Sequence, residues 1–333
     1  MKILTLLLGF LPGLFPGNAL SCLNEDGEPI DSWTIIKAPQ TADTYLYAGP
    51  REDLYQSGLK LNDTFSGALS HTLKQIWLED TSYVLFNDEP PYSTSYNYTV
   101  GHTKGLFALE DDGTGFWITH SIPAFPSGPK TSSSYTGLLS NAWTYGQNIF
   151  CLSLTASTID SISYSWLLTV PNVYDFSLSN GIKTTFKNIT ALTENKISKA
   201  SICSFFSIKT IGNQTLTIFS KSTQWNNDLW SVCVAPALKK DLLVESWIRG
   251  SAIGPSCSSS FTVTDVLEVD FNSNMTWSEI DDHSKWATSI DGIYSCFGDI
   301  NRMTTQYVRG GGAFCYKSKY NLENSVSKES SCD

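Results

Sequence analysis

The sequence has little of what marks the commonest membrane proteins, metalloenzymes and serine hydrolases. Beyond the first 15 of its 333 residues, no stretch approaches 18 uninterrupted apolar residues, which argues against a membrane-spanning helix. It contains no C-x-x-C or histidine-rich segment that would indicate a metal site, and no G-x-S-x-G motif of a serine hydrolase. Only 16% of the residues are charged, and long charge blocks and low-complexity linkers are absent, so we expect a packed globular protein.

The N-terminus and the cysteines indicate the secretory route. Met1-Lys2 precedes a short apolar run over 3–15, and small residues follow it at 17–19, which is typical of a signal peptide at residues 1–19. Eight widely spaced cysteines favour disulfide bonds over metal binding. We therefore expect a secreted or lysosomal protein without membrane attachment. Five N-x-S/T sequons predict glycosylation at Asn62, Asn97, Asn188, Asn213 and Asn274.

Two of only four histidines occur in the same short pattern, His102-Thr103-Lys104 and His283-Ser284-Lys285. Residues i and i+2 of a strand point to the same face, so each H-x-K pattern presents an imidazole and an ammonium side by side. This pair suits attack on a phosphate, because lysine binds the non-bridging oxygens while histidine acts as nucleophile or proton donor. A single H-x-K is usually structural, but its repetition favours a functional site.

The residues downstream of the two patterns also match. Eighteen residues after His102 comes His120, and eighteen after His283 comes Asn301. Turn-forming residues lie between them, at 111–113 in the first case and 291–292 in the second. Each half therefore predicts a strand, a tight connection and a returning strand that brings a polar cluster back beside the H-x-K.

Hydrophobic periodicity predicts interleaved strands and helices. Strands are expected over 33–38, 81–86, 105–109, 115–119, 149–155 and 215–220, and helices over 69–77 and 224–248. The interleaving predicts an α/β or mixed α+β class, in which two similar halves meet at a common site.

Short motifs spread in order over nearly the whole chain resemble those of the deoxyribonuclease II family. They are ALSC (19–22), NDEPP (87–91), GHTKG (101–105), GFWITHSIP (115–123), TYGQ (144–147), DHSKW (282–286), GDINR (298–302) and RGGG (309–312). The resemblance implies a metal-independent acid endonuclease that acts on DNA without a cofactor. It also implies one catalytic domain over 20–333 with a phospholipase D-like fold. In that fold two pseudo-symmetric halves, about 20–175 and 176–333, each have a sheet flanked by helices.

The resemblance also assigns roles to individual residues. It implies that His102, Lys104, His283 and Lys285 are catalytic, and that His120, Asp299 and Asn301 support them. One imidazole would form a phosphohistidine while the other protonates the 5′-oxygen, which leaves a 3′-phosphate and a 5′-hydroxyl. Superfamily precedent favours His102 as nucleophile, although the sequence does not decide this, and either Asp299 or Asp282 is a candidate carboxylate partner for the donor.

The net charge of −10 opposes binding of a polyanion at neutral pH. Near pH 5 many carboxylates are partly protonated and histidines are cationic, so we expect activity in an acidic compartment. A basic cleft would still be required. Its candidate residues are Lys104, Lys285, Arg302 and Arg309.

Several interpretations remain open. Trp117 and Trp286 would either stack on bases or pack in the core, His120 would be either functional or a core histidine, and the RGGG glycines would either bind phosphate or form a tight turn. The resemblance implies three disulfides, Cys22–Cys151, Cys257–Cys332 and Cys296–Cys315, which leaves Cys203–Cys233 as the fourth by elimination. The alternative function is a catalytically silent secreted glycoprotein that binds nucleic acid or a host protein.

Overall fold

The computed structural model describes residues 19–50, 52–93, 99–111, 113–258, 260–271, 275–318, 320 and 322–332. Of the expected signal peptide only Ala19 falls in these ranges, and the sequons at Asn97 and Asn274 lie outside the described residues. Across the described ranges, no helix has the length and apolar character needed to cross a bilayer.

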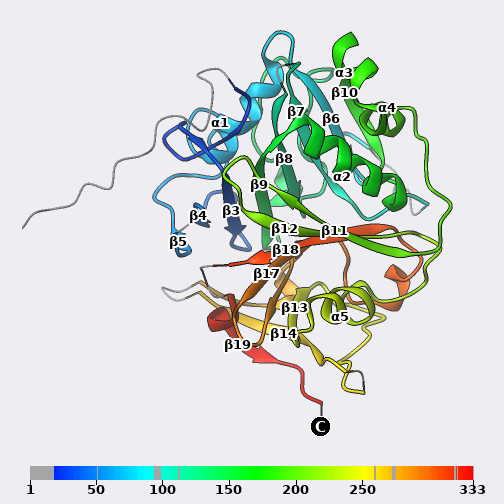
Figure 1. Ribbon diagram of the computed structural model, residues 1–333. Coiled ribbons are helices and arrows are strands. Elements are labelled where there is room, and N and C mark those ends of the chain that lie inside the picture. The colour runs from blue at the N-terminus through cyan, green and yellow to red at the C-terminus, as the bar shows by residue number, and fades with distance from the viewer. Residues whose placement is uncertain are drawn as a thin grey trace, which may run out of the picture.

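The first half of the chain forms an antiparallel sheet, which lies in the upper part of Figure 1. In the described residues its strand order is β10-β6-β7-β8-β9-β3-β4-β5. The strands are β3 (Ser32–Lys37), β4 (Tyr45–Ala48), β5 (Tyr55–Gln56), β6 (Ser82–Asn87), β7 (Lys104–Leu109), β8 (Thr114–His120), β9 (Gln147–Thr155) and β10 (Val173–Ser177), and β1 (Cys22–Leu23) pairs separately with β2 (Pro29–Ile30). The hairpin predicted around residues 111–113 is confirmed as β7 and β8.

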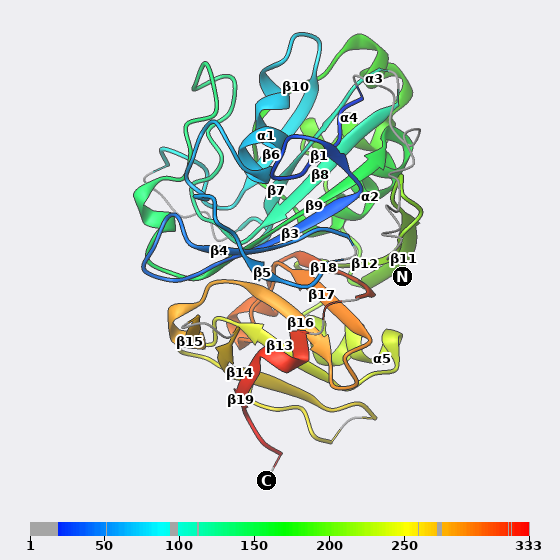
Figure 2. The same ribbon diagram turned by 90° about the vertical axis from the view of Figure 1, so that its left-hand side faces the viewer.

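The second half forms another sheet, below the first in Figures 1 and 2. Its order is β11-β12-β18-β17-β16-β13-β14-β15, with β19 paired to β14, and only β13 and β14 run parallel among these described strands. The strands are β11 (Cys203–Lys209), β12 (Thr215–Lys221), β13 (Leu242–Ser246), β14 (Val263–Asp270), β15 (Thr276–Ser278), β16 (Lys285–Ser289), β17 (Tyr294–Gly298), β18 (Gly311–Lys317) and β19 (Val326–Glu329). The protein combines helices and strands, with more sheet than helix, and this agrees with the mixed α+β class expected from the sequence.

Helices cover the two sheets. Helix α1 (Ala68–Lys74) contributes to a hydrophobic cluster with the first sheet, and α5 (Ala235–Leu238) to one with the second. The others are α2 (Ala156–Thr169), α3 (Asn180–Thr185) and α4 (Lys187–Thr193). Short 3₁₀ turns lie at Gln75–Trp77, Ser140–Ala142, Glu279–Asp281, Thr304–Gln306 and Leu322–Ser325, and a π-helical turn at Trp230–Val234.

The long helix predicted over 224–248 is wrong. Helical structure there is confined to residues 230–238, and it ends where Lys239 adopts a left-handed backbone conformation with φ of 56°. Residues 242–246 instead form β13, between β14 and β16. All five residues of β13 are buried, and its apolar residues suit a strand that is covered on both faces. Pairing with strands on both sides outweighs the local helical pattern.

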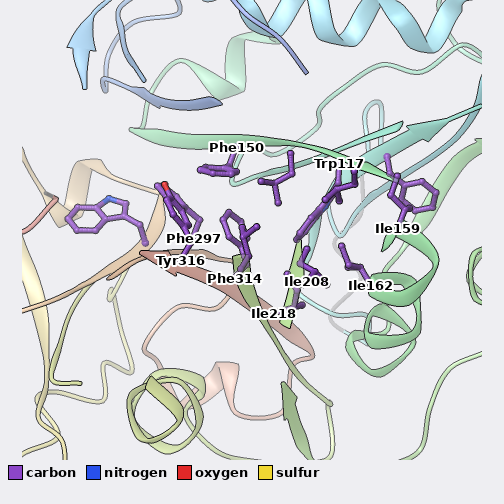
Figure 3. Close-up of a cluster of buried hydrophobic side chains, with 14 of the residues drawn as sticks. Trp117, Phe150, Ile159, Ile162, Ile208, Ile218, Phe297, Phe314 and Tyr316 are labelled. Atoms are coloured by element: carbon purple, nitrogen blue, oxygen red, sulfur yellow. The ribbon is translucent and has the colours of Figure 1, made fainter. Parts of the chain in front are cut away.

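A shared hydrophobic core joins the two sheets (Figure 3). The Phe150 ring of β9 lies 5.0 Å from that of Phe297 and 4.7 Å from that of Phe314, both in the second sheet. Trp166 of α2 stacks on Phe107 of β7 at 5.3 Å, which extends this core under the helix. The halves are therefore packed face to face through aromatic side chains, and the ends of their strands are fixed relative to each other.

All eight cysteines form the disulfides expected. They are Cys22–Cys151, Cys203–Cys233, Cys257–Cys332 and Cys296–Cys315. The last joins the directly paired strands β17 and β18, next to the segment that holds Asp299. The pair reached by elimination is thus confirmed together with the three implied by resemblance.

Candidate active site

Each H-x-K lysine is the first residue of a strand, and each histidine comes just before it. Lys104 begins β7 and Lys285 begins β16. The returning strands are β8, which ends at His120, and β17, which is followed by Asp299. The predicted hairpins are confirmed, but the strand alternation expected for the whole motif applies only from the lysine onward. Contacts with the other half must fix the histidines.

Each histidine is indeed anchored on the opposite half of the molecule. The backbone N–H of His102 donates to the Gly310 carbonyl at 2.8 Å, and that of His283 donates to the Gly146 carbonyl at 2.9 Å. The Lys285 N–H donates to Asn148 Oδ1 at 2.8 Å, which adds a second tie from β16 to the first half. Neither motif is therefore positioned by its own half alone.

The glycines beside the first motif allow this close approach. A Cβ atom on Gly101 would lie 1.9 Å from the Thr169 carbonyl oxygen, and one on Gly310 would lie 2.2 Å from the same oxygen. Gly311 and Gly312 belong to β18 and pair with β12, so their backbones lie in the sheet. The RGGG glycines thus serve close backbone packing, and Gly311 and Gly312 lie in a strand rather than in the tight turn that was one of the two expectations.

Asp88, which sequence reasoning missed, lies next to three basic side chains of the site. Its buried carboxylate lies 2.5 Å from Lys104 Nζ, 3.0 Å from Arg309 Nη2 and 3.9 Å from His102 Nε2. Burial favours its protonated form, but Lys104, His102 and Arg309 together hold the pKa of Asp88 below its usual range. In the sequence, only the NDEPP motif pointed to Asp88. Its place beside Lys104 follows from the pairing of the preceding residue, Asn87, with Lys104, and that pairing is a tertiary feature.

The ring of His102 is oriented by the backbone of the second half. Its Nδ1 lies 2.6 Å from the Asp299 carbonyl oxygen, and since a carbonyl only accepts, Nδ1 must carry the proton. In the neutral ring Nε2 then has a free lone pair. Burial, followed by the nearby Lys104, lowers the pKa of His102 well below its ordinary value, which favours this neutral form.

His283 has a different environment. Its ring contacts those of Tyr145 and Trp247, and its Nε2 is buried without a partner among the described residues. The Asp282 carboxylate accepts from Trp277 Nε1 and from the Ser284 N–H, both at 2.7 Å, rather than from the imidazole. Asp299 reaches His102 through its backbone. Neither aspartate therefore has the contact expected of a carboxylate partner for the donor.

Electrostatic effects cross between the halves. Burial and then Lys285 and Lys104 lower the pKa of His283 to about 3, and Lys285 also contributes to the lowered pKa of His102. Burial and then Lys104 lower the pKa of Lys285 to about 7. Burial raises the pKa of Asp299 to about 7 despite the opposing Lys104. The two motifs thus share one electrostatic environment.

The supporting residues lie at the same strand ends. His120 ends β8, across from the start of β7, and its Nδ1 accepts from the Ile122 N–H at 3.2 Å. Burial and then Lys104 lower the pKa of His120 to about 3, so the ring is neutral and Nε2 carries its hydrogen. Within the described part of the chain, His120 Nε2 and Asn301 Oδ1 are buried without partners.

Comparison with known proteins agrees with this geometry. The family model described as deoxyribonuclease II matches residues 21–331. The chain belongs to the deoxyribonuclease II family. It is 33% identical to mouse deoxyribonuclease-2-alpha, over 90% of this chain and 89% of the mouse protein. It is 31% identical to Caenorhabditis elegans deoxyribonuclease-2, over 91% and 90% respectively, and 30% identical to rat deoxyribonuclease-2-beta, over 99% and 98%.

The four residues predicted to contact DNA in this deoxyribonuclease II family member are buried instead. The guanidinium of Arg302 is fully buried, 2.5 Å from Asp265 and 3.6 Å from Asp228, so the expectation that it lines a cleft is wrong. Trp286 is fully buried in the core, and Trp117 packs on Phe314, so both tryptophans follow the packing interpretation. Arg309 is bound by Asp88 and acts on the site through that carboxylate.

Proposed function

We propose that this chain is an acid endonuclease that hydrolyses DNA phosphodiesters without a metal ion, leaving 3′-phosphate and 5′-hydroxyl ends. The family match supports DNA as substrate. The observation that carries the proposal is the reciprocal anchoring of the two H-x-K motifs, which gives one neutral imidazole with a free Nε2 and a second, unpartnered imidazole in a site rich in lysine. We further propose a phospholipase D-like arrangement for residues 20–333, supported by the matching hairpins that carry the two motifs.

The first step transfers the phosphoryl group to His102. Its Nε2 attacks phosphorus while the bond to the 5′-oxygen breaks, and that oxygen takes a proton from His283. In the imidazolium that forms, the Nδ1–H group still donates its hydrogen bond to the Asp299 carbonyl oxygen, and this bond stabilises the developing positive charge. The ammonium groups of Lys104 and Lys285 neutralise the non-bridging oxygens, a role that metal ions fill in many other nucleases.

The second step releases the product. His283, now neutral, accepts a proton from a water molecule that attacks phosphorus, and the bond between phosphorus and His102 Nε2 breaks. The 3′-phosphate leaves, His102 returns to its neutral form and His283 is protonated again. The assignment of His102 as nucleophile rests on its fixed tautomer, since only an unprotonated Nε2 can attack.

The same site supports the proposed activity in acid. Below pH 7 Lys285 is charged and Asp299 is neutral, because the pKa of each lies near 7. Above pH 7 the site loses the Lys285 charge and gains a negative charge at Asp299, which disfavours a phosphodiester anion. A bound phosphodiester in turn offsets the lysine charges that depress the pKa of His283, so substrate binding promotes the protonated donor.

Plasmid cleavage at pH 5 and pH 7.5 in excess chelator tests the proposal. Wild type should cleave at pH 5, His102→Ala and His283→Ala should not, and the matched control His71→Ala, on helix α1, should keep wild-type activity. Full loss of wild-type cleavage in chelator would contradict metal independence. A protein that retards DNA in a gel but never cleaves it would be the silent binding glycoprotein instead.

The route through the cell is a separate proposal. We propose that residues 1–19 direct the protein to secretion or to the lysosome, and that sequons carry glycans. Among the described sequons, Asn213 supports this proposal because it is exposed at the β11–β12 turn, whereas Asn62 and Asn188 are half-buried. Peptide mapping before and after removal of N-linked glycans, on protein secreted by transfected cells, tests both points.

A further inference from the structure

The His283 imidazole contacts two aromatic rings that come from different halves of the chain. Tyr145, just before β9, stacks on it with ring centroids 3.9 Å apart and planes inclined by 7°. Trp247, just after β13, lies with its ring centroid 4.5 Å away and its plane inclined by 46°. Both side chains are half-buried. They define an aromatic clamp, Tyr145 and Trp247, on the second catalytic histidine.

The charged groups around His283 oppose its protonation. Burial lowers its pKa most, and Lys285 at the start of β16, Lys104 on β7 and Arg249 beyond β13 lower it further. Asp282, its chain neighbour, already accepts hydrogen bonds from Trp277 and Ser284. A histidine that must donate a proton in acid therefore lacks, among the described residues, the carboxylate that commonly stabilises an imidazolium.

Aromatic faces supply a different kind of stabilisation. The π face of tyrosine or tryptophan attracts a cation within about 6 Å of the ring centroid, and both rings of the clamp meet this distance. The parallel stacking on Tyr145 also fixes the plane of the imidazole, and with it the direction in which Nε2 points. Orientation and charge stabilisation are the two tasks that a carboxylate partner would otherwise perform.

We propose that Tyr145 and Trp247 are positioning residues which orient the His283 imidazole and stabilise its protonated form during proton donation. This inference rests on the proposed function, in which His283 protonates the 5′-oxygen. It goes beyond that function by assigning the role of a carboxylate to an aromatic pair, one ring from each half. The clamp would then make the proton donor dependent on correct packing between the halves.

Two pairs of variants separate this role from simple packing. Tyr145→Phe and Trp247→Phe keep an aromatic face. Tyr145→Leu and Trp247→Leu remove the aromatic face but keep much of the apolar volume. Two measurements are made on each variant: the dependence of DNA cleavage on pH, and the pKa of His283 by NMR in saturating inorganic phosphate. His71 serves as the internal reference in the NMR titration.

The leucine variants should lower the pKa of His283 by about 0.5 to 1.5, the range expected for a lost cation–π contact, and should move the alkaline limb of the rate profile to lower pH by a similar amount. The phenylalanine variants should keep most of both values. Methionine variants at the same positions replace any leucine variant that does not fold.

Two results would overturn the clamp: leucine variants that lose rate equally at every pH with an unchanged pKa of His283, or phenylalanine variants as impaired as the leucine ones. Failure of the proposed function has a different signature, because wild type would then not cleave DNA at all. In that case the NMR titration still decides whether the two rings stabilise the imidazolium.

Discussion

Replacing Asp88 by asparagine should destabilise the fold as well as impair the site. Asp88 is fully buried, and its carboxylate binds Lys104 from the first half and Arg309 from the second. Asparagine preserves the shape but leaves the buried Arg309 without its carboxylate partner and leaves Lys104 with only Glu89, whose carboxylate lies 3.8 Å from Nζ. Removing one partner of a buried ion pair typically costs about 3–5 kcal/mol, mainly because the remaining charge is uncompensated. We expect the lower end, about 3 kcal/mol, because the Arg309 guanidinium keeps its contacts with the Val100 and Gly101 carbonyls.

The loss of stability caused by Asp88→Asn should become smaller in strong acid. The pKa of Asp88 is held below its usual range in the folded protein, so its contribution to stability is fully present above the pKa of an unfolded aspartate, about 3.9. The contribution is lost only as the pH falls toward the depressed folded pKa. The gap between wild type and Asp88→Asn should therefore be constant from pH 7 to about pH 4.5 and shrink below pH 4.

Thermal unfolding at a fixed scan rate measures this gap. At roughly 2 °C per kcal/mol, as for other large domains, Asp88→Asn should melt about 6 °C below wild type at pH 7. Glu194→Gln is the matched control, since Glu194 pairs with Lys196 on the surface and should change the melting temperature little. If Asp88→Asn melted with wild type, or if the gap widened in acid, the assignment of Asp88 as the charge that joins the halves would be refuted.

Three further outcomes are expected. Asp299→Asn removes the negative charge that appears as the pH rises through about 7, so the ratio of activity at pH 7.5 to that at pH 5 should rise several-fold; an unchanged ratio would exclude Asp299 from the pH response. Cleaved DNA should accept label from a polynucleotide kinase without prior phosphatase treatment, and 5′ ends already blocked by phosphate would rule out expulsion of the 5′-oxygen. Replacing Cys203 and Cys233 together by alanine should lower stability by about 3.5 kcal/mol, as estimated for a loop of about 30 residues, and calorimetry showing no loss would contradict a formed disulfide.

The sequence by itself determined the two H-x-K patterns and their hairpins, and the family resemblance with elimination gave the disulfide pairing. The H-x-K patterns, the turns after them and the strand alternation are local, and local patterns survive folding because they depend on neighbouring residues. The long helix over 224–248 failed for the converse reason. Residues 242–246 have a helix-compatible pattern, but burial between β14 and β16 decided their conformation.

Only the tertiary structure decided which residues surround the two histidines. Asp88 lies next to Lys104 because β6 pairs with β7, and Tyr145 lies on His283 because the two halves pack face to face. Arg302 looked like a cleft residue until its buried pairing with Asp265 was visible. The sequence specifies such contacts only through the whole packing, since each joins residues far apart in the chain. It therefore identified the candidate catalytic groups, whereas the fold determined their surroundings and their partners.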